Sequence, residues 1–282
     1  MKLTSRGIAT TCIALLSLAS VNAQTLSYSN TGSTYSQNFN SLTTNGVTLP
    51  TTGGVIFAFN DPTGINATNM VGWYGEAALK TVYLANSGGT TTGAFYSYST
   101  NGASSASDQA LGLETTTTSG QEIFGLGISN TTGVTLTNFN ISFNAEYWHD
   151  GTATSAKTLA FGYVVGGGAT LPSISTNGVI TPASGSYVND ATLDYTKAGS
   201  GVARGLDGHA STNSTAETDT LNVSWAPNTT LWLVWDFGTN TAQTPGLAID
   251  NVSFSAVPEP STYVLLGVGA LALLVGYRHR RS

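Results

Sequence analysis

Residues 136–151 read LTNFNISFNAEYWHDG, and this stretch decides the fold class of the chain. From Phe139 to Tyr147 every second residue is apolar, in the order Phe, Ile, Phe, Ala, Tyr. A period of two is typical of a β-strand with one buried face, whereas a helix repeats its apolar positions every three to four residues. The stretch therefore predicts one long strand with a core-facing side and an outward-facing side.

Similar alternation recurs along the chain, separated by Asn-Gly, Gly-Gly and Ser-Asn turns. The further strands are expected near residues 35–39, 55–59, 95–98, 123–128, 159–165, 221–225, 231–237 and 247–254. No amphipathic helix of three turns is expected between Gln24 and Val257, and the longest loops are expected in residues 166–218. The pattern predicts an all-β protein whose residues 24–256 form a two-sheet, antiparallel, jelly-roll-like β-sandwich.

The first 23 residues have the composition of a secretory signal peptide. Lys2 and Arg6 precede an apolar stretch at residues 8–19, and residues 21–23 read Val-Asn-Ala, a small-x-small cleavage site. We therefore expect export by the secretion machinery. Cys12, the single cysteine, lies inside this segment, so the mature chain has no disulfide and must be stabilised by its core or by bound ions.

Charge narrows the range of partners. Between the predicted signal peptide and the C-terminal segment, residues 24–260 contain all fifteen acidic side chains but only four basic ones, a net charge of −11. A domain this acidic, without a basic patch, is not expected to bind nucleic acid. It is compatible with bound calcium.

Residues 257–282 form a three-part segment. Pro258, Glu259 and Pro260 are followed by an uncharged apolar stretch at 263–277, expected to be one short transmembrane helix, and then by a basic end at 278–281. This order resembles the PEP-CTERM sorting signal of Gram-negative bacteria. The resemblance implies an exosortase partner, an inner-membrane intermediate held by the C-terminal helix, and delivery to the cell surface or extracellular space. The alternative is a plain membrane anchor.

The body is similar to a group of secreted bacterial β-sandwiches that recur with PEP-CTERM tails and have no settled biochemical activity. The resemblance rests on motifs that follow in order, including residues 37–42, 93–97, 146–148, 231–236 and 246–252. Residues 249–252, Ile-Asp-Asn-Val, also resemble the last strand of jelly-roll carbohydrate-binding modules. This resemblance implies a fold and no activity, because fold alone does not assign an activity.

Two aromatic groups are candidate ligand-binding residues. Glu146, Trp148 and Asp150 alternate with the core positions of the long strand and are expected to share its outer face, where a Trp beside carboxylates suits a sugar ring. Trp73 and Tyr74 lie between glycines and are expected on a loop near the same surface. The alternatives are a Trp148 covered by a loop, and a Trp73-Tyr74 pair that plugs the end of the sandwich.

A calcium site is predicted at the sandwich edge. The resemblance of residues 249–252 to jelly-roll modules implies that Asp250 meets Asn38 or Asn40 of the first strand there. Calcium prefers carboxylate and amide oxygens of this kind. The alternative is that Asp250 caps backbone amides.

The sequence thus predicts an exported, exosortase-sorted envelope or extracellular-matrix protein with a structural or adhesive role, associated with exopolysaccharide in a biofilm. Its alternatives are a carbohydrate-binding module and a glycoside hydrolase. The chain lacks the G-x-S-x-G and H-E-x-x-H motifs, and its acidic residues are scattered, so an enzyme is not expected.

Overall fold

The computed structural model describes residues 24–257 except 45–46, 48, 50–52, 80–81, 90–91, 101, 103–107, 175–178 and 240–242. The predicted signal peptide, the Pro-Glu-Pro motif and the predicted C-terminal helix lie outside the described residues. Within the described part of the chain, no helix is long and apolar enough to cross a membrane. Helical geometry in this part includes η2, a short 3-10 turn at Ala191–Leu193.

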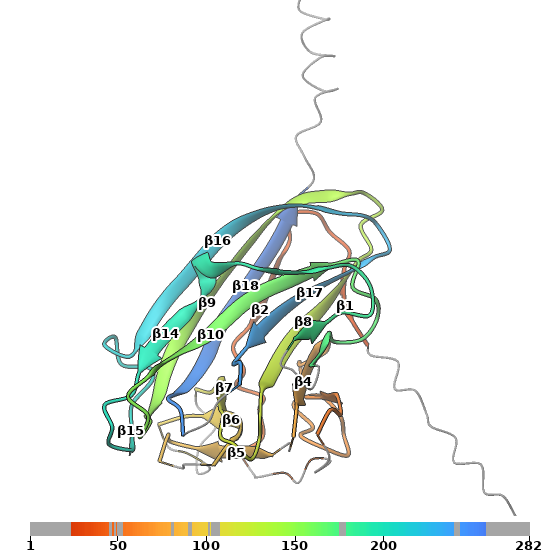
Figure 1. Ribbon diagram of the computed structural model, residues 1–282. Coiled ribbons are helices and arrows are strands. Elements are labelled where there is room, and N and C mark those ends of the chain that lie inside the picture. Colours follow the sequence, from red (N-terminus) through yellow and green to blue (C-terminus); the bar gives the residue numbers. More distant parts are fainter. Residues whose placement is uncertain are drawn as a thin grey trace, which may run out of the picture.

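Two eight-stranded sheets stack face to face (Figure 1). In sheet A the order is β13-β10-β17-β8-β4-β3, with β1 beside β8 and β14 beside β10. Its strands are β1 (Leu26–Tyr28), β3 (Phe57–Ala58), β4 (Trp73–Ala77), β8 (Glu122–Asn130), β10 (Ala156–Val165), β13 (Tyr187–Asn189), β14 (Tyr195–Ala198) and β17 (Thr230–Asp236).

In sheet B the order is β15-β9-β18-β7-β6-β5, with β16 beside β9 and β2 beside β18. Its strands are β2 (Thr34–Gln37), β5 (Tyr83–Asn86), β6 (Ala94–Tyr98), β7 (Ala110–Glu114), β9 (Leu136–Asp150), β15 (Arg204–Gly205), β16 (Ser214–Trp225) and β18 (Gly246–Val257). A separate two-stranded ribbon joins β11 (Ser173–Ile174) to β12 (Ile180–Thr181).

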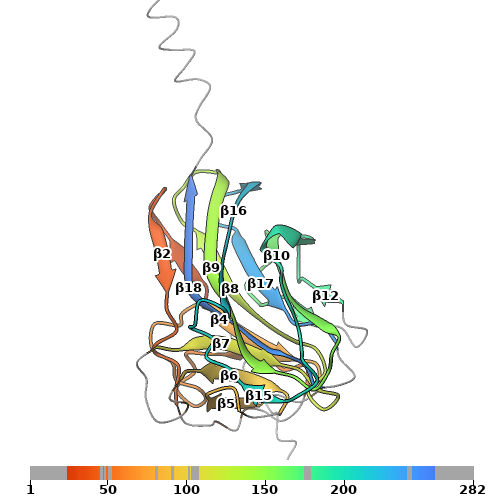
Figure 2. The ribbon, with the colours of Figure 1, turned by 90° about the vertical axis from the view of Figure 1, so that its left-hand side faces the viewer.

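The long strands alternate between the two sheets, as in a jelly roll. The chain passes from β7 in sheet B to β8 in sheet A, to β9 and then β10, and later from β16 to β17 to β18 (Figure 2). All pairings in these sheets are antiparallel except β1 with β8 and β5 with β6. The predicted all-β sandwich is therefore confirmed, including the long strand at residues 136–150.

The space between the sheets is filled mainly by aromatic rings. Trp235 of β17 lies at the centre, with ring centroids 5.6 Å from Trp73 and from Phe124, and 5.3 Å from Phe161. Burying one such side chain contributes about 1.5–3 kcal/mol, so this cluster supplies much of the stability of a domain without disulfides.

Each sheet also carries a smaller apolar cluster on its outer face. On sheet B it contains Tyr96, Tyr98, Trp148 and Ala248. Tyr98 stacks on Tyr96 and on Trp148, with ring centroids 4.6 Å and 5.5 Å apart. The outer face of sheet B is thus covered at this end of the molecule.

Two expectations are wrong. Trp73 and Tyr74 lie in strand β4 and not in a loop, and both side chains are buried. Residues 166–218, expected as the longest loops, hold five short strands, β11 to β15, and the beginning of β16. The pairing of β13 and β14 with β10, and of β15 with β9, joins distant segments that no local pattern reveals.

Candidate functional site

The site lies on the outer face of sheet B, where β9 and β18 run side by side. In β18, Leu247 and Ile249 belong to the core between the sheets, so Ala248 and Asp250 point the other way. Ala248 pairs with Glu146 of β9. The alternation predicted from the sequence therefore places Glu146 correctly on the outward side, and Asp250 lies on the same side.

The predicted exposure of this face is wrong. Trp148 is 0% exposed, and Glu146 is buried beside it. The indole Nε1 donates a hydrogen bond to Glu146 Oε2 at 2.8 Å. The loop between β15 and β16 covers the ring so closely that a Cβ on Gly208 would lie 2.3 Å from indole atoms. The alternative of a Trp covered by a loop is the one observed.

Asp150 does not share the face of Glu146. The β9–β18 register shifts between Gly246 and Leu247, so β9 carries an extra residue there and its alternation is interrupted. Asp150 instead accepts a hydrogen bond from the hydroxyl of Tyr147 at 2.8 Å and pairs with Arg204 at 3.0 Å. Burial raises the pKa of Asp150, but its hydrogen bonds, of which those from Ser200 have the largest effect, hold this pKa below its ordinary value.

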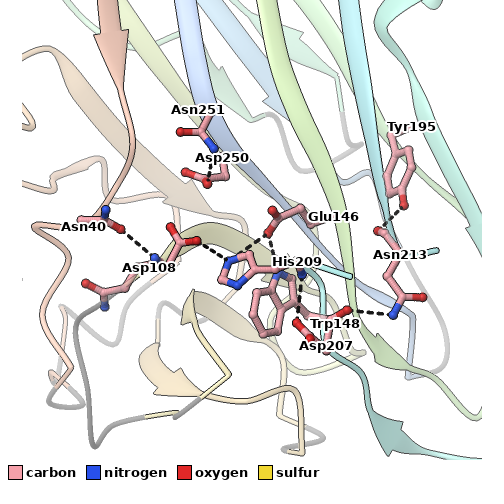
Figure 3. Close-up of polar contacts among 11 residues, drawn as sticks. Asn40, Asp108, Glu146, Trp148, Tyr195, Asp207, His209, Asn213, Asp250 and Asn251 are labelled. Carbon is pink, nitrogen blue, oxygen red and sulfur yellow. Dashed lines mark hydrogen bonds and ion pairs between the residues drawn. The ribbon is translucent and has the colours of Figure 1, made fainter. Parts of the chain in front are cut away.

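Three ionisable side chains meet above this face. Each of Asp108, His209 and Asp250 offers one ligand atom, and the three atoms lie within 4.8 Å of one another. Figure 3 shows His209 between Asp108 and Glu146, with Asp250 nearby. His209 Nε2 is 3.6 Å from Asp108 Oδ2 and 4.0 Å from Glu146 Oε2. Such a group of carboxylates around one imidazole can hold a divalent cation or share protons.

Local turns position His209. The Asp207 carboxylate accepts a hydrogen bond from the backbone N–H of His209 at 3.1 Å, and Asn213 Nδ2 donates to the Asp207 carbonyl at 2.8 Å. Asx turns of this kind fix a loop without regular secondary structure. The imidazole then packs edge-on against Trp148, with ring centroids 4.9 Å apart.

Asn40 is linked to the site indirectly, through the residue that follows Asp108. Its Oδ1 accepts a hydrogen bond at 2.8 Å from the backbone N–H of Gln109, the residue after Asp108 (Figure 3). Asn38 is exposed, and its Oδ1 accepts from the backbone N–H of Asn40. The Asp250 carboxylate accepts a hydrogen bond from Asn251 Nδ2 and lies within 4.8 Å of the ligand atoms of Asp108 and His209. Asn40 positions the segment that carries Asp108.

Burial and mutual repulsion act on the carboxyl groups. Burial, with a smaller effect from Asp108, raises the pKa of Asp250 to about 7 despite a backbone hydrogen bond at Asn251. Burial likewise raises the pKa of Glu146 to about 8, opposed by the bond from Trp148 and assisted by Asp250 and Asp108. A cation placed among these groups would stabilise their charged forms.

The other predicted ligand residues lie apart from this cluster. Trp73 and Tyr74 are in sheet A; Trp73 belongs to the core between the sheets, and Tyr74 packs on the outer face of that sheet against Trp232. The sequence analysis did not identify Asp108 and His209. Both lie between strands, where no periodic pattern marks a side chain that points toward a distant strand.

Comparisons with solved structures find only distant similarity. A cellulose-specific carbohydrate-binding module, CBM28, has 15% identity and a TM-score of 0.31, over 71% of this chain and 92% of that one. The xylan-binding CBM22-1 domain of Paenibacillus barcinonensis Xyn10C has 10% identity and a TM-score of 0.30, over 74% and 99%. These low TM-scores carry no inference about this chain.

The first structures found are much longer proteins. The enzymatically active domain of bacteriophage CBA120 tailspike protein 4 matches with 14% identity and a TM-score of 0.27 over 53% of this chain, which spans only 16% of that domain. A search of curated proteins gives no significant match.

One family model matches the chain. Residues 256–281 match the PEP-CTERM protein-sorting motif, and the match begins where strand β18 ends. Pro258, Glu259 and Pro260 fall inside the matched segment. The motif implies export and exosortase-dependent sorting toward the surface of a Gram-negative cell, so the resemblance predicted from the sequence is confirmed for this segment.

Proposed function

We propose that the protein is a structural or adhesive component of the bacterial envelope or extracellular matrix, associated with exopolysaccharide and without a catalytic reaction of its own. The observation that carries the proposal is the sorting motif at residues 256–281, which follows directly on the last strand of the sandwich. A folded domain joined to a sorting signal is delivered outside the inner membrane after processing. Its secretory signal at residues 1–23 and its membrane intermediate are parts of the same proposal.

Burial of the aromatic residues supports a structural role over sugar stacking. All five tryptophans and all ten phenylalanines are buried, and none of the ten described tyrosines is fully exposed. A module that stacks a pyranose needs an accessible aromatic ring. The rings of this chain pack against one another, which suits a domain that must persist outside the cell without a disulfide.

A second candidate, a carbohydrate-binding module, has a different observation in its favour. A surface depression is lined by Ser36, Gln37, Asn38, Asn69, Asn251, Val252 and Ser253. Amide and hydroxyl groups of this kind can exchange hydrogen bonds with sugar hydroxyls. Binding there would depend on polar contacts, and Trp148 would have no direct part in it.

Two experiments test the proposal. In the host, the natural protein should appear at the surface or in the matrix without residues 263–277, and deletion of the exosortase should retain it in the membrane. Cell fractionation with intact-mass analysis measures both. A protein that stays in the inner membrane at full length in the presence of the exosortase would contradict the sorting role.

Affinity electrophoresis against a panel of polysaccharides separates the two candidates. A matrix component is expected to bind the exopolysaccharide of its host weakly and over a broad surface. Tight retardation by one defined glycan, abolished by Asn69→Ala and Asn251→Ala but not by Asn138→Ala on another part of the surface, would favour the binding module. Release of reducing sugar from the panel would instead identify a hydrolase.

A further inference from the structure

We propose that Asp108, His209 and Asp250 bind one divalent transition-metal ion of the Zn²⁺ type, and that this ion fixes two surface segments to strand β18. Asp108 precedes β7, His209 lies in the loop between β15 and β16, and Asp250 lies within β18. The inference does not depend on the proposed envelope role. It shares Asp250 with the calcium site predicted from the sequence, but its other ligands and its ion are different.

The separations suit a metal centre after a small adjustment. Zn²⁺ binds nitrogen and carboxylate oxygen at about 2.0–2.2 Å, so neighbouring ligand atoms in a tetrahedral site lie about 3.4 Å apart. Asp108 Oδ2 and His209 Nε2 are already 3.6 Å apart, and no ligand pair exceeds 4.8 Å. The side chain of Asp108 is 52% exposed, so core packing does not fix its rotamer.

The hydrogen bonding of Asp250 indicates an absent positive partner. This residue is 1% exposed. Its Oδ2 accepts a hydrogen bond from Asn251 Nδ2 at 2.7 Å, but its buried Oδ1 has no hydrogen-bond partner among the described residues. The buried Nε2 of His209 likewise has none there. Buried polar atoms are rarely left unsatisfied, because their desolvation is not repaid.

The negative charge of the cluster also indicates a bound cation. Glu146 adds a third carboxylate 4.0 Å from His209 Nε2. The three basic side chains in the described part of the chain contact other groups. Lys157 donates to the carbonyl of Thr239, Lys197 lies over the ring of Tyr195, and Arg204 pairs with Asp150. A bound cation would supply the missing positive charge.

The imidazole favours a transition metal over calcium. Calcium is held by six to eight oxygen atoms, whereas Zn²⁺ accepts a mixture of imidazole and carboxylate ligands. Asn40 Oδ1, an amide oxygen of the calcium site predicted from the sequence, is already engaged with the N–H of Gln109. Glu146 acts as a positioning residue, since it holds Trp148, on which the imidazole of His209 packs.

Such an ion would serve as a cross-link. It would join two segments without regular structure to the last long strand, across wide separations in sequence. Metal binding to a site that exists only in the folded chain adds its binding free energy to stability. This matters for a chain whose only cysteine, Cys12, lies in the predicted signal peptide.

The test uses full-length protein, treated with a chelator and then titrated with ZnCl₂, MnCl₂ or CaCl₂ by calorimetry, with metal content measured by elemental analysis. We expect one Zn²⁺ per chain, a lower melting temperature after chelation, and recovery on adding Zn²⁺. His209→Gln and Asp108→Asn should each weaken Zn²⁺ binding by about 100-fold or more, above the effect of losing an outer-shell group. Asp61→Asn, an exposed turn carboxylate, is the matched control and should bind normally.

Several results would overturn the site. Absence of Zn²⁺ binding by the natural protein would do so, as would equal binding by the natural protein and both variants. Calcium binding that is tighter than zinc binding and survives His209→Gln would show an oxygen-only site. Asp108→Asn changes a half-exposed side chain, so it remains informative if substitution of buried Asp250 prevents folding. Co²⁺ should give a visible absorption band that His209→Gln abolishes.

Discussion

Replacement of Trp148 by Ala tests whether this residue is core or binding surface. The ring is fully buried, stacks on Tyr98 at 5.5 Å and contacts His209 edge-on at 4.9 Å. Removing a buried Trp typically costs about 3–5 kcal/mol. For a domain of this size, each kcal/mol lowers the melting temperature by about 2–4 °C, so a fall of about 6–20 °C is expected.

Urea denaturation followed by circular dichroism measures the loss, with Trp148→Phe as the matched variant. Phe retains an aromatic ring but leaves Glu146 without the N–H of the indole, which should cost about 1–3 kcal/mol. The Ala variant should therefore lose clearly more than the Phe variant. If Trp148→Ala stays within about 0.5 kcal/mol of the natural protein, as exposed positions usually do, the described packing of this face is refuted.

Three further predictions concern a buried carboxyl group, a tightly packed glycine and the sorting motif. Burial raises the pKa of Glu114 to about 8, despite a hydrogen bond from Gln243. The folded chain therefore holds the proton of the Glu114 carboxyl group more tightly than the unfolded chain does. The free energy of unfolding should then fall as pH rises from about 4.5 to 8. Glu114→Gln should increase the free energy of unfolding at pH 9 by up to about 5 kcal/mol, seen as a higher melting temperature, and should change it little at pH 4. Equal effects at both pH values would contradict this. Gly208→Ala should cost about 1–3 kcal/mol in a urea titration, since its Cβ would meet the Trp148 ring, whereas Gly89→Ala, with open space around the new atom, is the control and should cost less. In the host, Glu259→Ala should prevent removal of the tail, and intact-mass analysis showing normal processing would argue against recognition of the motif.

The sequence by itself determined most of the long strands and, up to the bulge near Asp150, the inward and outward phases of β9. A period of two is a local property of the backbone, so the alternation from Phe139 to Tyr147 was enough to predict β9 and to place Glu146 and Trp148 on its outer side. The sorting motif was equally readable, because it is a contiguous segment whose meaning does not depend on the fold.

Local bulges limit what alternation can predict. The register shift between β9 and β18 moves Asp150 to the side of Tyr147, and nothing in the sequence of β9 marks this shift. A bulge depends on the pairing of one strand with its neighbour, and the sequence of a single strand does not contain that information.

Only the tertiary structure decided what covers the outer face. The position of a residue in the alternation of its strand tells which side of the sheet it occupies. It does not tell whether a distant loop packs on that side. The loop that carries Gly208 and His209 buries Trp148, and the segment before β7 brings Asp108 to Asp250. These contacts join segments far apart in the chain, so the pattern of any one segment does not contain them.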